Sequence, residues 1–217
     1  MIRRPPRSTH CISSAASDVY KRQVQCGIGR CGTLNGWQSI DGADKIVPDA
    51  ISWAKGMGGG FPIGAIWLKS RNTGDGELSD LLGPGSHGST FGGSPLASAV
   101  SCAVLRTIID DNLSAYAKEL YKVIINTFND KKISLIKEIR GRGLMIGFVI
   151  DHEKFNLTKK TDQNPSIYIV NELAKNGLLT VPAGPDVIRW LPPLNVQKSE
   201  VKEAIQIMIS TLDKEAK

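Results

Sequence analysis

The stretch Ile51–Gly60, with the sequence ISWAKGMGGG, joins a short apolar run to a lysine and then to four glycines. The run Ile51–Ala54 has the length and composition of a buried strand, and the glycines after Lys55 indicate a loop. Ligands of open α/β sheets bind at the carboxyl ends of the strands. The stretch therefore predicts an α/β domain in which Lys55 lies beside a ligand.

Lys55 is a candidate for covalent chemistry because it follows the predicted strand directly. A lysine at such a strand end is partly desolvated, which favours the neutral amine, and a neutral amine can attack an aldehyde. On this feature alone, a surface lysine beside a glycine-rich turn is the commoner case, so both interpretations stay open.

The stretch Gly88–Gly93, with the sequence GSTFGG, precedes a predicted helix start. Ser94 is a suitable N-cap, and Pro95 suits the first helical position. Small residues let the backbone approach a ligand, and the hydroxyls of Ser89 and Thr90 near a helix start suit a phosphate group. The alternative is a glycine-rich turn followed by an ordinary N-cap.

The remaining sequence alternates between helical and strand patterns after a second helix that is expected from about Ser114. We expect strands at 144–150, 178–181 and 187–191, and helices at 165–177 and around 201–212. The sequence therefore predicts part of a larger α/β domain at 23–112 and a C-terminal α+β small domain at 113–217.

Arg189 lies inside the predicted strand 187–191, where an arginine has to pair with another group. A bidentate contact with a substrate carboxylate is one solution. A structural salt bridge is the commoner one.

The net charge of +6 is concentrated at the N-terminus, where residues 1–22 hold five basic residues and one acidic residue. We therefore expect no nucleic-acid binding by the rest of the chain.

The four cysteines show no Cys-x-x-Cys spacing and the three histidines are scattered, so we expect no metal site and no disulfide framework. Reduced thiols fit a cytoplasmic compartment. No apolar run approaches the roughly 20 residues of a membrane span.

Residues 1–22 also differ from the rest in pattern, since they show neither helical nor strand periodicity. They resemble translated adapter sequence, and a transit peptide is the alternative. We expect a non-native tail that does not pack, with the native protein entering near Val24.

Several stretches resemble the class III aminotransferases in their residues and in their order along the chain: Gln25–Arg30, Ala54–Ala65, His87–Ala97 and Gly141–Met145. The strand around Arg189 matches the same proteins, and within the class the chain is most similar to the acetylornithine aminotransferases. The resemblance covers Val24 to the C-terminus. It implies a fold type I transferase that depends on pyridoxal 5′-phosphate (PLP) and works as a homodimer.

The resemblance also implies roles for single residues. Lys55 would hold the cofactor as a Schiff base and shuttle a proton during catalysis, and Gln25 would lie near the phenolic oxygen of the pyridine ring. Thr90, with Ser89 beside it, would bind the cofactor phosphate of the partner subunit. Arg189 would hold the α-carboxylate of glutamate or of the ornithine-type substrate.

The reaction implied is amino transfer between glutamate and N-acetylglutamate 5-semialdehyde, which gives N-acetylornithine in arginine biosynthesis. Relatives that act on ornithine, succinylornithine or 4-aminobutyrate are alternatives. A non-catalytic dimerisation fragment is an alternative of another class.

One position departs from the family. The family has an aspartate three positions before the glutamine, paired with the pyridine nitrogen, whereas this chain has Arg22. A cation there disfavours protonation of the ring nitrogen and weakens the electron sink. Because the N-terminal half of the family has no counterpart in the chain either, we expect the chain alone to be inactive.

Overall fold

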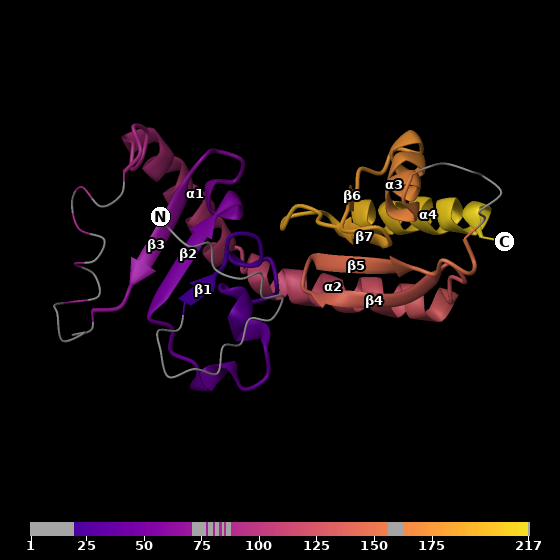
Figure 1. The fold of residues 1–217 in the computed structure, drawn as a ribbon, viewed down its shortest axis with the longest axis horizontal. Coiled ribbons are helices and arrows are strands. Elements are labelled where there is room, and N and C mark those ends of the chain that lie inside the picture. Colours follow the sequence, from indigo (N-terminus) through magenta and orange to yellow (C-terminus); the bar gives the residue numbers. More distant parts are fainter. Residues whose placement is uncertain are drawn as a thin grey trace. The chain divides into compact units, whose positions relative to one another are not determined.

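The computed structural model describes residues 20–70, 88–155 and 163–216, together with 77, 80, 83 and 85 (Figure 1). The chain forms two compact units. Of the described residues, the first unit contains those up to Ile28 and those within Asn35–Arg106, and the second contains Gly29–Leu34 and those from Thr107 onwards. The short segment Gly29–Leu34 therefore belongs to the second unit, although its neighbours on both sides belong to the first.

A three-stranded mixed sheet forms the centre of the first unit. Its strands are β1 (Tyr20–Arg22), β2 (Ala50–Ala54) and β3 (Gly64–Leu68), in the order β1-β2-β3. β1 runs parallel to β2, and β3 runs antiparallel to it. Short 3-10 turns connect them: η1 (Gly36–Ser39), η2 (Ala43–Lys45) and η3 (Lys55–Gly58). The apolar run predicted as a strand is therefore the central strand of the sheet.

β1 lies within the range that the sequence sets apart as a tail. Tyr20–Arg22 pair with Ala50, Ile51 and Ser52 of β2, and the backbone N–H of Gln23 donates to the carbonyl of Ser52 at 2.8 Å. For these three residues, the expectation of no packing is wrong, because parallel pairing satisfies their backbone without any apolar periodicity in the side chains. Residues 1–19 lie outside the described part of the chain, so for them the tail stays a prediction.

The helix α1 (Pro95–Asp110) begins where the sequence predicts it. The Ser94 hydroxyl accepts a hydrogen bond from the backbone N–H of Ala97 at 3.3 Å, which is an N-cap contact. Further along, the hydroxyl of the buried Ser101 donates to the carbonyl of Met57 at 3.1 Å. A Cβ on Gly59 would lie 2.8 Å from a methyl group of Val104. The helix thus packs closely against the glycine-rich loop after Lys55.

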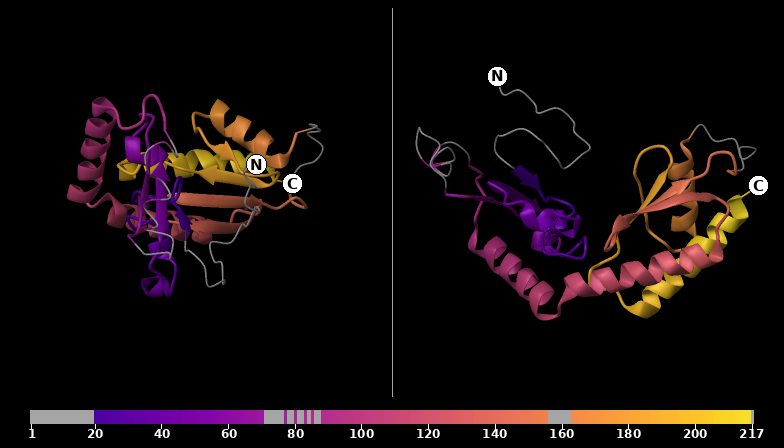
Figure 2. Two further views of the ribbon diagram at one scale, coloured as in Figure 1. Left: turned by 60° about the vertical axis from the view of Figure 1, so that its left-hand side comes forward. Right: turned by 90° about the horizontal axis from the view of Figure 1, so that it is seen from below.

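The second unit is an antiparallel sheet with helices against one face, as the right-hand view of Figure 2 shows for α2 and α4. The strands, in the order β4-β5-β7-β6, are β4 (Ile136–Arg142), β5 (Met145–Ile150), β6 (Val181–Pro182) and β7 (Val187–Trp190). The helices are α2 (Leu113–Lys131), α3 (Pro165–Lys175) and α4 (Lys198–Glu215). This arrangement confirms the predicted α+β module.

The core of this unit follows from the alternation of side chains along β5. Ile146, Phe148 and Ile150 are fully buried and point to the helical face. Phe148 lies at the centre of an aromatic cluster, with ring centroids 4.8 Å from Phe128 and 5.8 Å from Trp190. Apolar stripes of α2, α3 and α4 complete the core. The other face of the sheet carries Arg189, the one polar residue of β7.

The end of α3 corrects one predicted strand. Gly177 has a φ of +90°, and its N–H donates to the carbonyl of Ala174, while the N–H of Leu178 donates to that of Leu173. These are the two hydrogen bonds of a Schellman motif, so the predicted stop at Gly177 is confirmed. The predicted strand 178–181 is wrong up to residue 180, because Leu178 completes the helix end and pairing begins only at Val181.

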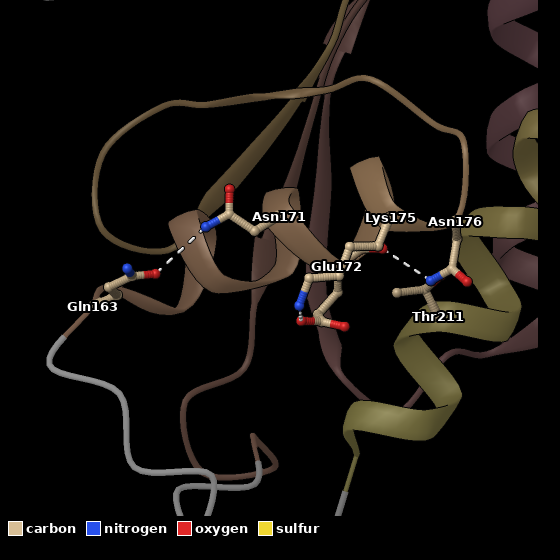
Figure 3. Close-up of polar contacts among 6 residues, drawn as sticks. All are labelled: Gln163, Asn171, Glu172, Lys175, Asn176 and Thr211. Atoms are coloured by element: carbon tan, nitrogen blue, oxygen red, sulfur yellow. Dashed lines mark hydrogen bonds and ion pairs between the residues drawn. The ribbon is translucent and has the colours of Figure 1, made fainter.

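A side-chain contact joins this helix end to α4 (Figure 3). The Asn176 amide donates to the carbonyl of Glu172 at 2.9 Å and to the hydroxyl of the buried Thr211 at 3.3 Å. On the exposed side, the hydrogen bond with Glu172 raises the pKa of Lys175.

Within the described ranges, no helix is both long and apolar enough to cross a membrane.

Candidate active site

Lys55 directly follows β2 and is the first residue of η3, with an exposed side chain. Its φ is +49°, in the left-handed region that costs a non-glycine residue roughly 1–2 kcal/mol. Such strain persists where the surrounding structure enforces it, and it is concentrated at functional sites. A Cβ added to the next residue, Gly56, would have no neighbour closer than the Cβ of Ile28 at 4.0 Å. Among the described residues, the position next to the lysine therefore has open space around it.

Gln25 lies at the same edge of the sheet as Lys55. Because β1 and β2 are parallel, their carboxyl ends lie at one edge. Arg22 of β1 pairs with Ser52 of β2. Gln25 lies three residues after Arg22, and Lys55 lies three residues after Ser52. The structure thus brings together two of the residues that the sequence predicts for the cofactor.

The turn that carries Gln25 is tightly packed. Gln23 is buried, and its side-chain oxygen accepts from the backbone N–H of Trp37 at 3.3 Å and from the thiol of Cys26 at 3.6 Å. A Cβ on Gly27 would lie 2.7 Å from the carbonyl oxygen of Gln23. Contacts of its neighbours on both sides therefore hold the backbone of the half-buried Gln25.

Ser89 and Thr90 lie on a separate turn of the first unit, ahead of α1, and both are exposed. The backbone N–H of Gly92 donates to the carbonyl of Ser89 at 3.0 Å, which closes the turn. Two hydroxyls beside a helix N-terminus can bind an anion, because the first N–H groups of a helix lack partners within it.

Arg189 belongs to the second unit and lies in the centre of the sheet, where it pairs with Gly147 of β5 and Val181 of β6. Its neighbours Ile188 and Trp190 are buried in the core, so the half-buried Arg189 lies on the opposite face. The residue opposite it on β5 is a glycine, which adds no side chain to that face. An arginine placed in this way can present its guanidinium to a carboxylate.

Sequence reasoning gave no role to Arg30, the last residue of the first family-like stretch. Its guanidinium donates to the carbonyl of Leu144 at 3.2 Å and to that of Pro192. Burial lowers the pKa of the Arg30 guanidinium, with a smaller opposing effect from Cys31. An arginine within an otherwise small and apolar motif was the available signal, but its partners are more than a hundred residues away in sequence.

Comparison with known proteins identifies the family. The family description "Aminotransferase class-III" matches residues 22–212. The chain belongs to the class III aminotransferases. It is 36% identical over 190 residues to the acetylornithine aminotransferase of Clostridium acetobutylicum, covering 85% of this chain and 43% of that protein. It is 38% identical over 190 residues to the Synechocystis acetylornithine aminotransferase, covering 86% of this chain and 40% of that protein.

Solved structures of aminotransferases share the fold, which confirms the predicted fold class. An ornithine aminotransferase of Toxoplasma gondii, with partial occupancy of PLP at its active site, matches with a TM-score of 0.75 and 28% identity, over 91% of this chain and 43% of that one. An acetylornithine aminotransferase of Elizabethkingia anophelis matches with a TM-score of 0.72 and 31% identity, over 88% and 44%. This class III aminotransferase chain spans less than half the length of the relatives it matches.

Proposed function

We propose that this chain is the C-terminal part of a PLP-dependent enzyme that moves an amino group between glutamate and N-acetylglutamate 5-semialdehyde in the cytoplasm. The backbone of Lys55 is the observation that carries the proposal, because strained residues are concentrated at functional sites and this one lies at the carboxyl end of a central strand. The curated acetylornithine aminotransferases, at 35–39% identity, support the substrate.

The residues at the carboxyl edge of β1 and β2 fit PLP in two respects. Lys55 is exposed beside the open space at Gly56, as an amine needs to be to reach an aldehyde. Gln25 lies at the same edge, where its amide can donate to the phenolic oxygen of the ring. When bound, PLP supplies the electron sink that makes loss of a proton from the substrate Cα possible.

The chain's own residues would bind, orient and move protons. The amine of Lys55 would hold the cofactor and, once released by the substrate, take the proton from Cα of the amino donor. Arg189 would hold the α-carboxylate of that donor through charge-assisted hydrogen bonds. Ser89 and Thr90 would contact the phosphate of the cofactor in the other subunit of a homodimer.

Arg22 does not fit the same cofactor. It is the last residue of β1, three positions before Gln25, where the family places an aspartate against the ring nitrogen. A cation there opposes protonation of that nitrogen. We therefore propose that the chain, as its sequence stands, binds the cofactor covalently but transfers amino groups poorly or not at all.

Covalent trapping tests the role of Lys55 directly. The 217-residue chain is incubated with PLP and reduced with borohydride, and the modified peptides are identified by mass spectrometry. We expect one modified lysine, Lys55, and loss of the long-wavelength absorbance in Lys55→Ala. Lys45 and Lys69 are matched controls in the same unit, since Lys45 is exposed in η2 and Lys69 follows β3.

Modification of Lys45 or Lys69 in preference to Lys55 would contradict the aminotransferase role of this edge. A chain that takes up no PLP at all, yet forms dimers, would favour the alternative of a non-catalytic dimerisation module. Ornithine is the second candidate substrate, because solved ornithine aminotransferases share the fold with TM-scores of 0.72–0.75. Comparing turnover of N-acetylornithine and ornithine by the full-length protein separates the two.

A further inference from the structure

The pairing of β5 with β7 ends beside the turn of the β4–β5 hairpin. The last paired residues are Ile146 and Trp190. Extending the same antiparallel register by two residues sets Leu144 opposite Pro192. A proline has no N–H to donate, and the next residue, Pro193, has none either. Backbone carbonyls at this end of the sheet therefore need hydrogen-bond donors from another part of the chain.

Arg30 supplies those donors from the segment Gly29–Leu34. One nitrogen of its guanidinium donates to the carbonyls of both Leu144, just before β5, and Pro192, just after β7. In return, the backbone N–H of Leu144 donates to the carbonyl of Arg30 at 2.9 Å. Hydrogen bonds from a charged donor are stronger than neutral ones, and here the donor is half-buried.

The backbone around Arg30 is shaped for this contact. Gly143, at the tip of the β4–β5 hairpin, has a φ of +52°, and a Cβ there would lie 2.5 Å from the Arg30 carbonyl oxygen. Gly29 also has a positive φ, of +82°, and a Cβ there would lie only 3.0 Å from the Ser114 hydroxyl. The segment thus lies against the backbone of the hairpin tip at Gly143 and, at Gly29, against the side chains of Ser114 and Leu194.

We propose that Arg30 is a positioning residue that acts through Arg189. β7 has only four residues and its outer neighbour β6 has two, so strand pairing ends at Trp190, and Arg30 supplies a charged contact beyond that point. Arg189 lies three residues before Pro192, one of the two carbonyls that Arg30 binds. Fixing that carbonyl fixes the twist of β7 and, with it, the direction in which Arg189 points.

The consequence for the reaction concerns binding rather than chemistry. This step rests on the proposed function, in which Arg189 binds the substrate α-carboxylate. If the end of β7 is released, Arg189 samples more directions, and ordering it costs the substrate part of its binding free energy. That contact is present in the ground state and in the transition state alike, so its weakening raises KM while kcat changes little.

The test compares Arg30→Met, Arg30→Lys and Arg189→Met in the full-length holoenzyme, with glutarate as a dicarboxylate probe that cannot react. For Arg30→Met we expect the KM for glutamate and the Ki of glutarate to rise very roughly tenfold, the loss of a charge-assisted hydrogen bond. We expect kcat to stay within about twofold. Arg30→Lys keeps the charge and a donor, so it should recover part of the loss.

The double variant Arg30→Met with Arg189→Met separates positioning from mere stability. If Arg30 acts through Arg189, its substitution should leave the Ki of glutarate unchanged once Arg189 is gone. Amide exchange of the peptide 187–191 should be faster in Arg30→Met and slower again in Arg30→Lys, with the middle of α4 as an unaffected control.

An Arg30→Met enzyme with unchanged Ki, or with the same relative loss on the Arg189→Met background, would overturn the positioning role. An unchanged Ki in Arg189→Met alone would instead show that the proposed carboxylate site is wrong, and the inference would fall with it. If Arg30→Met does not fold, Arg30→Lys decides, since a folded Lys variant with wild-type Ki and wild-type exchange also overturns the proposal.

Discussion

Replacing Gly143 by alanine should destabilise the second unit far more than an ordinary glycine substitution. The φ of +52° costs a non-glycine residue roughly 1–2 kcal/mol. The added Cβ would also lie 2.5–2.6 Å from backbone atoms of Arg30, Cys31 and Gly32, and backbone cannot swing away as a side chain can. The loop has to move, which weakens the hydrogen bonds of Arg30 with Leu144, worth about 1–3 kcal/mol in total. We expect a loss of about 3–5 kcal/mol in the free energy of unfolding.

Gly177→Ala is the matched control for this substitution. Gly177 also has a left-handed backbone, with a φ of +90°, but a Cβ there would have nothing within 4 Å. It should therefore lose only the conformational part, about 1–2 kcal/mol. Urea unfolding of the 217-residue chain measures both, followed by the fluorescence of the buried Trp190 in a background in which Trp37, Trp53 and Trp67 are phenylalanine. Equal losses in the two variants would refute the close backbone packing of Gly143 against residues 30–32.

Three further predictions concern the site and the core. Arg189→Ala in the full-length enzyme should raise the KM for glutamate by about ten- to a hundredfold, because a charge-assisted contact is worth ~1.5–3 kcal/mol, and an unchanged KM would return Arg189 to a structural role. In the full-length protein, Arg22→Asp should raise kcat in steady-state assays and Arg22→Asn should raise it less, because only the aspartate favours a protonated ring nitrogen, and an unchanged kcat would contradict this role of the position. Phe148→Ala, which removes a fully buried ring, should lower stability by about 3–5 kcal/mol in urea unfolding, and a loss below about 1 kcal/mol would contradict the packing of the aromatic cluster.

Local signals in the sequence were enough to predict the helix ends and the position of Lys55. Ser94 and Pro95 begin α1 because a hydroxyl cap and a fixed φ act within one turn. Gly177 ends α3 because the left-handed residue of a Schellman motif favours glycine. An apolar run followed by a lysine predicted β2 and its carboxyl end. In each case the cause lies within a few residues of its effect.

β4 was not predicted, and its geometry explains why. The strand has the sequence IKEIRGR, and a register irregularity lies between Ile136 and Glu138. Ile136 and Ile139 both pack against the core although they are three residues apart. A bulge replaces the alternation of period two with this spacing, so the strand has neither the pattern nor the composition that predicts one.

The stretch Gln25–Arg30 shows the limit of what a motif conveys. Its first residues belong to the unit that holds Lys55, whereas Gly29 and Arg30 belong to the unit that holds Arg189. One short segment therefore carries a residue proposed to touch the cofactor and another proposed to set the direction of a substrate contact. The resemblance to a family could be recognised from its residues alone. The role proposed for Arg30 could not be predicted in this way, because its partners are a hairpin tip and a proline segment more than a hundred residues later in the sequence.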